Sequence, residues 1–260
     1  MALENGVLVH GPSSWACAVR TEGGEVTLRS GRKPLRASAV ENPLLRGPAR
    51  LAEVFALLPT VRRALPEARL PYERPAAVAG LVGSSLLARS IRRSRLAPVA
   101  QEALAAGLAL APALVALRGS TLAAYHGAEH ISIGTYEHGE PRPREHERCG
   151  SHLVGPLVVT STAGSVVARG APPHLRLVAR LGAAAGAMAA SVELFNWMVR
   201  NQGHPLAKAL ARPGEELQHR ILTAEPSEEQ LAVANAALVE CLRLESAADG
   251  GPDAAEAPSP

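Results

Sequence analysis

Residues 149–168 read CGSHLVGPLVVTSTAGSVVA, and no Asp, Glu, Lys or Arg interrupts this run. Its length matches the roughly 20 apolar residues that a helix needs to cross a bilayer. Further uncharged runs cover residues 75–88, 104–117 and 181–192. The last run extends to residue 199 if its single charge, Glu193, is tolerated. These runs predict a mainly α-helical protein built as a helical bundle.

The apolar runs are rich in Ala, Gly, Ser and Thr rather than in Leu, Ile and Phe. Their driving force for membrane insertion is therefore marginal. Small residues permit close helix packing both in lipid and in a soluble bundle. We expect a bundle embedded in the cell membrane, with the lipid bilayer as its partner. A soluble helical bundle remains the alternative.

The first 30 residues favour strands rather than helices. Residues 6–10 and 15–20 are rich in Val and other strand formers, and residues 25–29 alternate polar and apolar side chains. Residues 21–24, TEGG, form a turn signal between them. A small β-hairpin module is therefore expected to precede the bundle.

The chain divides into four expected segments. Residues 1–43 hold the β module and a connector, and residues 44–200 hold the helical bundle, with the motif region at 118–150. A soluble helical tail covers residues 201–245, where a short helix is expected at 204–211 and Pro213 suits the first turn of the next helix. Within this tail, SEEQ at 227–230 is a capping box that opens the last helix. Residues 246–260 lack apolar periodicity and are expected to be disordered.

Residues 125–150 read YHGAEHISIGTYEHGEPRPREHERCG and carry the densest chemistry in the chain. On a helix, His126, Glu129 and His130 share one face. Two imidazoles at this spacing can chelate one divalent cation, and zinc is the expected one. Glu129 is then the candidate catalytic residue, as a general base towards a water that the metal activates, or as a further ligand. The alternative is a structural polar cluster without metal.

A catalytic zinc site needs a third protein ligand. The local candidates are His138, His146 and Cys149, together with Glu137. The distant candidate is Glu193, because a lone carboxylate on an apolar helix is costly unless it is paired or bound to a cation. A salt bridge to an arginine on a neighbouring helix is the alternative for Glu193.

The same blocks resemble the YqhQ-like family, a domain-of-unknown-function family of bacterial membrane proteins that are often labelled metal-dependent enzymes. The resemblance is carried by YHGAEH at 125–130, YEHGE at 136–140 and HERCG at 146–150. Further matching blocks include residues 5–12, 15–26, 204–206 and 217–218. The chain departs from the family pattern at Asn5, His10, Ile131, Ser132 and Asn196.

The motif and the resemblance together predict a metal-dependent hydrolase with an unknown small-molecule or peptide substrate, cleaving a peptide, amide or ester. The alternatives are a non-catalytic membrane protein with a structural metal site, and a membrane scaffold or metal-transport accessory. Nucleic acid is not an expected partner, because the net charge is only +3 and aromatic residues make up 3% of the chain.

Overall fold

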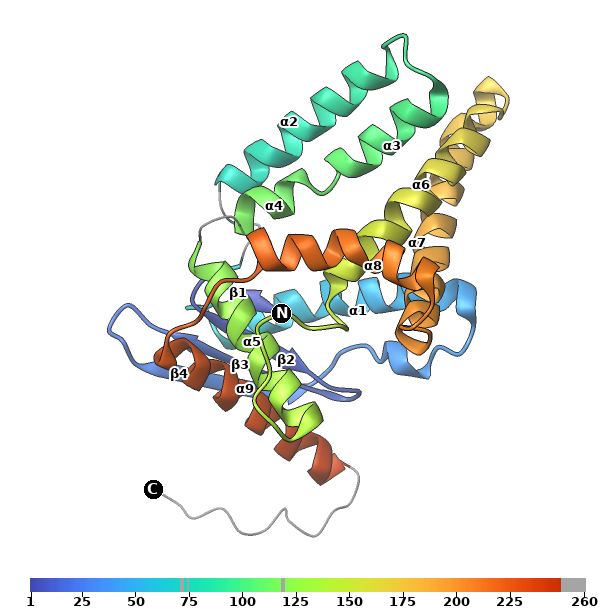
Figure 1. The fold of residues 1–260 in the computed structure, drawn as a ribbon. Coiled ribbons are helices and arrows are strands. Elements are labelled where there is room, and N and C mark those ends of the chain that lie inside the picture. Colours follow the sequence, from blue (N-terminus) through green and yellow to red (C-terminus); the bar gives the residue numbers. More distant parts are fainter. Residues whose placement is uncertain (71–72, 74, 118–119, 249–260) are drawn as a thin grey trace.

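The computed structural model describes residues 1–70, 73, 75–117 and 120–248. It shows a body built on a β-sheet and helical hairpins that extend away from this body (Figure 1). The mainly α-helical prediction is confirmed. Of the segment predicted to be disordered, residues 246–248 form the end of the last helix, and residues 249–260 lie outside the described residues.

The sheet has four antiparallel strands in the order β1-β2-β3-β4. They are β1 (Ala2–Leu3), β2 (Gly6–His10), β3 (Ser14–Arg20) and β4 (Val26–Arg32). The turn between β3 and β4 closes at Gly24, whose φ of 85° is open to glycine at little cost. The predicted small β module is therefore confirmed.

Helices cover both faces of this sheet. Side chains alternate between the faces of a strand, so neighbouring residues of β2 and β3 enter two separate cores. One core joins the sheet to α1 (Pro43–Ala64), and it includes Leu8, Cys17, Leu57 and Val61. The other joins it to α5 (Thr121–His138) and α9 (Glu228–Ala248), and it includes Val7, Ala18, Tyr125 and Ala234. Two covered faces explain why six consecutive residues of β3 are buried.

The C-terminal helix α9 belongs to the body. Its predicted capping box is present, with Ser227 N–H donating to Gln230 Oε1 over 2.9 Å. Its apolar face packs on β2, β3 and α5. The periodicity of one helix predicts such a face but does not show which elements it packs against. The prediction that one helix ends at Ala211 and another begins near Pro213 is wrong, because α8 (Pro205–Leu217) runs through Pro213 into a π-helical turn, η5 (Gln218–Leu222).

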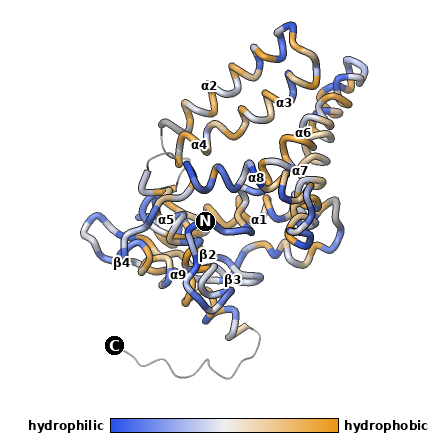
Figure 2. The backbone as a smooth tube through the Cα atoms, in the orientation of Figure 1, coloured by the Kyte–Doolittle hydropathy of each residue, from blue (hydrophilic) through white to orange (hydrophobic). Residues whose placement is uncertain are grey.

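The hairpins are formed by α2 (Pro75–Arg92) with α3 (Pro98–Leu108) and α4 (Ala111–Leu117), and by α6 (Val154–Arg169) with α7 (Arg176–Arg200). The short helices η1 (Ala37–Ala39), η3 (Gly150–Leu153) and η4 (Pro173–Leu175) lie in the connections. Figure 2 shows hydrophobic residues along much of these hairpins.

Three helical segments are long and apolar enough to span a membrane: Pro98–Val115, Gly150–Arg169 and Pro173–Arg200. Between 17% and 28% of each is buried inside the protein, so most of their apolar surface has no protein cover in the described part of the chain. Large apolar side chains are accordingly exposed there, among them Leu104, Val167, Leu177 and Leu181.

The hairpins hold one buried charge cluster. Glu102 on α3, with 5% of its side chain exposed, pairs with Arg92 of α2 at 3.1 Å and with Arg169 of α6 at 2.7 Å. The carboxylate therefore connects three helices and is compensated by two guanidinium groups.

Candidate metal centre

Helix α5 presents the two histidines of the HxxEH motif side by side. His126 and His130 are four residues apart, and their ring centroids lie 4.3 Å from each other. The helix ends at Gly139, whose φ of 72° gives a left-handed C-terminal cap. Pro141 and Pro143 then prevent further helix, so the predicted loop is confirmed.

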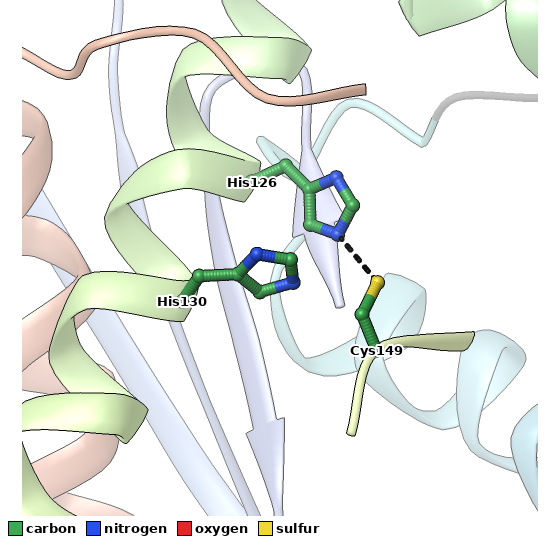
Figure 3. Close-up of side chains that lie close together, drawn as sticks. All are labelled: His126, His130 and Cys149. Carbon is green, nitrogen blue, oxygen red and sulfur yellow. Dashed lines mark hydrogen bonds between the residues drawn. The ribbon is translucent and has the colours of Figure 1, made fainter. Parts of the chain in front are cut away.

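The loop after α5 returns Cys149 to the two histidines (Figure 3). One ligand atom from each of His126, His130 and Cys149 lies within 4.8 Å of the other two. Cys149 Sγ is 3.6 Å from His126 Nε2. A tetrahedral zinc ion, with bonds of about 2.0–2.1 Å to nitrogen and about 2.3 Å to sulfur, separates such a pair by about 3.6 Å. The spacing of this pair therefore fits a zinc ion.

Backbone carbonyls fix both imidazoles. His126 Nδ1 lies 2.8 Å from Leu222 O, and His130 Nδ1 lies 2.7 Å from Arg144 O. A carbonyl oxygen only accepts, so each Nδ1 carries the hydrogen and donates it. The two Nε2 atoms are thereby left to serve as ligands. Metal-binding histidines in proteins are typically oriented in this way.

A close crossing of the chain brings the Leu222 carbonyl to His126. The segment that follows η5 passes over α5, where Ala224 N–H donates to Ala123 O over 2.9 Å. A Cβ atom on Gly127 would lie 2.2 Å from Ala224 O, far inside van der Waals contact. The glycine of the motif is therefore what allows this approach.

The Cys149 sulfur and the His126 imidazole form a hydrogen bond. Burial alone would raise the pKa of Cys149, but hydrogen bonds and positive charge from His126 and His130 outweigh burial and lower this pKa to about 4. Burial would lower the pKa of His126, yet the neighbouring Cys149 and Glu129 raise it. At neutral pH the sulfur is therefore a thiolate, which is the form that binds metals.

Glu129 lies beside this group rather than within it. Its Oε1 accepts a hydrogen bond from the amino group of Met1, and its Oε2 is buried without a hydrogen-bond partner among the described residues. Burial would raise the pKa of the Glu129 carboxyl, but Met1 and His126 outweigh burial and hold this pKa below its usual value. The carboxylate is therefore ionised and keeps one oxygen available.

The other local candidates have different partners. Both ring nitrogens of His146 are occupied, because Nε2 lies 3.2 Å from Glu137 and Nδ1 accepts from Arg148 N–H. His138 Nδ1 donates to Gly134 O over 2.9 Å, and its Nε2 faces Glu147 at 3.7 Å. His146 lies near the pair, with its ring centroid 5.6 Å from that of His130, but both of its nitrogens have these other partners. The third candidate donor that converges on the two histidines is therefore Cys149.

The distant candidate, Glu193, lies on α7 and forms an ion pair with Arg46 of α1 at 3.4 Å. This is the salt bridge that the sequence left open as the alternative. Glu193 is therefore absent from the group formed by His126, His130 and Cys149.

A cavity of about 720 Å³ opens beside the group. The lining from α5 and the loop that follows it includes His126, Glu129, His130, Glu137, His146, Arg148 and Cys149. The side chains from β2, α1 and α4 are mainly aliphatic, with His10 among them. The candidate ligands are thus accessible to a molecule larger than water.

Two comparisons with known proteins found a match. The profile of the family described as "Protein of unknown function (DUF1385)" matches residues 120–244. The "Uncharacterized protein YqhQ" of Bacillus subtilis (strain 168) is 32% identical over 130 residues, which are 47% of this chain and 41% of the relative. The resemblance to the YqhQ-like family is confirmed. No solved structure matches the chain.

The chain thus spans less than half of the length of this relative. The residues that match the family profile contain α5, the loop to Cys149, the two apolar helices α6 and α7, and most of α9. Every candidate site residue therefore lies among them.

Sequence reasoning missed the groups that orient this site. Leu222 and Arg144 act through backbone carbonyls, which leave no signal in a residue pattern. Gln218 is fully buried and holds the loop, because its Oε1 accepts from His146 N–H over 2.8 Å and its Nε2 donates to Ser151 Oγ over 2.8 Å. Its place in a block that matches the YqhQ-like family was the available signal.

The thiolate state of Cys149 has a measurable consequence. In chelator-treated protein, we expect iodoacetamide to alkylate Cys149 at a nearly constant rate between about pH 5.5 and pH 8, because its pKa lies near 4. An ordinary thiol would react about tenfold faster with each pH unit in this range.

Mass spectrometry of the alkylated peptides gives the rates, and Cys17 is the internal control. Burial raises the pKa of Cys17 to about 12, so this residue should stay unmodified. A Cys149 rate that climbs steadily with pH would show that the two imidazoles do not hold a thiolate.

Proposed function

We propose that this protein binds one divalent cation, zinc, through His126, His130 and Cys149, and that it catalyses metal-assisted hydrolysis. The observation that carries the proposal is the orientation of both histidines. Two backbone carbonyls take the Nδ1 hydrogens and leave two Nε2 atoms converging on one sulfur. Such an arrangement is expected of ligands and has no evident use in a simple packing role.

Three protein donors beside an open cavity favour catalysis over a structural role. Structural zinc sites usually have four protein ligands, whereas catalytic sites have three. A zinc ion held here would act as a Lewis acid and make water a nucleophile at neutral pH. Glu129 would accept the proton of that water on Oε2, the oxygen without a partner among the described residues.

The bond cleaved in this proposal is an ester, an amide or a peptide bond. A metal-transport role is less well supported, because transport needs ligands spread along a path. Here the converging ligands gather at one point, near the middle of α5, and Glu193 pairs with Arg46 instead of continuing such a path.

We further propose that the protein is an integral protein of the cell membrane. Support comes from the three segments that are long and apolar enough to span a bilayer and from their largely uncovered surface. The lipid bilayer would supply the missing cover, so that the hairpins lie in lipid and the body stays in water.

Metal analysis tests the site. Elemental mass spectrometry should find about one zinc per chain in purified protein, since three oriented donors bind one ion. His126→Ala and Cys149→Ser should lose it, because each removes a donor. Glu129→Gln should keep the metal, since this carboxylate lies outside the three donors.

Two matched controls make the metal analysis specific. His138→Ala removes another histidine of α5, and Glu193→Ala removes the distant carboxylate, and both should retain zinc. Absence of stoichiometric metal in every sample, even after zinc is added back, would contradict the proposal.

Membrane integration is tested by alkaline carbonate extraction of cell membranes. The chain should stay in the pellet and need detergent for release, because its apolar segments would otherwise be exposed to water. Recovery of folded protein in the soluble fraction without detergent would favour the soluble helical bundle.

A further inference from the structure

The cavity beside the candidate metal centre has both polar and aliphatic lining. Helix α5 and the loop that follows it contribute His126, Glu129, His130, Glu137, His146, Arg148 and Cys149, with Leu122 and Ile133 on the same helix face. The aliphatic side is the part from β2, α1 and α4, which contributes Leu8, Val54, Leu57, Ala113 and Leu117 and one polar residue, His10. A molecule that fits this cavity therefore needs a polar end and an apolar end.

We infer that the cavity holds a long hydrocarbon chain, and that the substrate is a lipid-like ester or amide whose polar end lies at the metal centre. The class of reaction rests on the proposed function, whereas the binding of the hydrocarbon chain does not. The volume of about 720 Å³ lies within the range of about 300–1,000 Å³ of small-molecule sites.

The aliphatic side argues against a peptide in this part of the cavity. A peptide has an amide in every residue, and each amide loses hydrogen bonds to water when it enters an apolar site. The aliphatic side chains of this side cannot replace those bonds. A hydrocarbon chain makes no hydrogen bonds to water and therefore loses none there. Each buried methylene strengthens binding about fourfold.

The cavity also adjoins a segment that is able to span a membrane. Ala113 lines the cavity from α4 and belongs to the apolar segment Pro98–Val115. Figure 1 shows α4 where the α2–α3 hairpin meets the body. A chain that lies among lipids along this segment can reach the cavity beside α4 without being transferred through water.

Helix α4 supplies a matched pair of variants. Ala113 lines the cavity, and Val115, two residues further on, lies on the other side of the helix with 48% of its surface exposed. Ala113→Phe places a ring against the cavity, whereas Val115→Phe places the same ring outside it. Both changes add bulk to the same short helix.

The probe is a hexadecanol that carries a photoreactive diazirine near the end of its chain, added to the full protein in lipid vesicles. After illumination, mass spectrometry should locate labels on peptides that line the aliphatic side, such as those with Leu57 and Leu117. Ala113→Phe should reduce this labelling on the order of tenfold, because the ring would exclude a few methylenes of the probe from the cavity. Val115→Phe should label like the unaltered protein.

Competition removes the dependence on a variant that folds poorly. Unlabelled hexadecanol should displace the probe from the cavity peptides, whereas butanol at equal concentration should not, because a short chain buries few methylenes. Labels found only on the exposed faces of the hairpins, or cavity labelling that neither hexadecanol nor Ala113→Phe reduces, would overturn the inference.

The His126→Ala variant separates this inference from the proposed function. Cavity labelling should persist in it, since the alcohol probe does not need the metal. If the cavity is labelled in a protein that never holds metal, the proposed function is refuted, whereas the inference that the cavity binds a hydrocarbon chain is supported. Stoichiometric metal without cavity labelling would have the opposite meaning.

Discussion

The site depends on one close approach of two backbone segments. The residues after η5 cross α5 at Gly127, where a Cβ atom would lie 2.2 Å from the Ala224 carbonyl oxygen. Ala224 N–H donates to Ala123 O, and Leu222 O receives the Nδ1 hydrogen of His126. A segment far away in the sequence thus sets the tautomer and the direction of the first ligand. In the middle of a helix Gly carries a conformational cost, and this contact explains why it is present.

The rest of the arrangement follows from holding α5 in place. On one side α5 packs with α9 against the sheet. On the other side the loop after Gly139 returns along the helix, and the buried amide of Gln218 fixes this loop through the His146 backbone and Ser151. Cys149 is thereby brought to the histidines. The cavity is lined by this polar group and by residues of β2, α1 and α4.

Local patterns in the sequence predicted the local features well. Helical spacing places His126 and His130 on one face, and strand-forming residues with TEGG at 21–24 mark the sheet. Long-range features were harder to predict. Cys149 was one of several nearby candidates, since the path of a proline-containing loop cannot be read from its composition. Glu193 was a candidate ligand because it is a lone carboxylate on an apolar helix, but it pairs with Arg46, which is distant in the sequence. The apolar face of α9 was evident, and only the fold shows that the sheet is its partner.

The most direct test of this account is the zinc affinity of Gly127→Ala, measured by competition with a chelator in protein that keeps its helical circular dichroism. The control is Gly186→Ala, a helical glycine of α7 with nothing within 4 Å of the added Cβ atom. We expect Gly127→Ala to bind zinc about 10–100-fold more weakly, because the Leu222 carbonyl moves away from His126. Gly186→Ala should bind like the unaltered protein. Equal affinity in the two variants would contradict the claim that the crossing at Gly127 orients the metal centre.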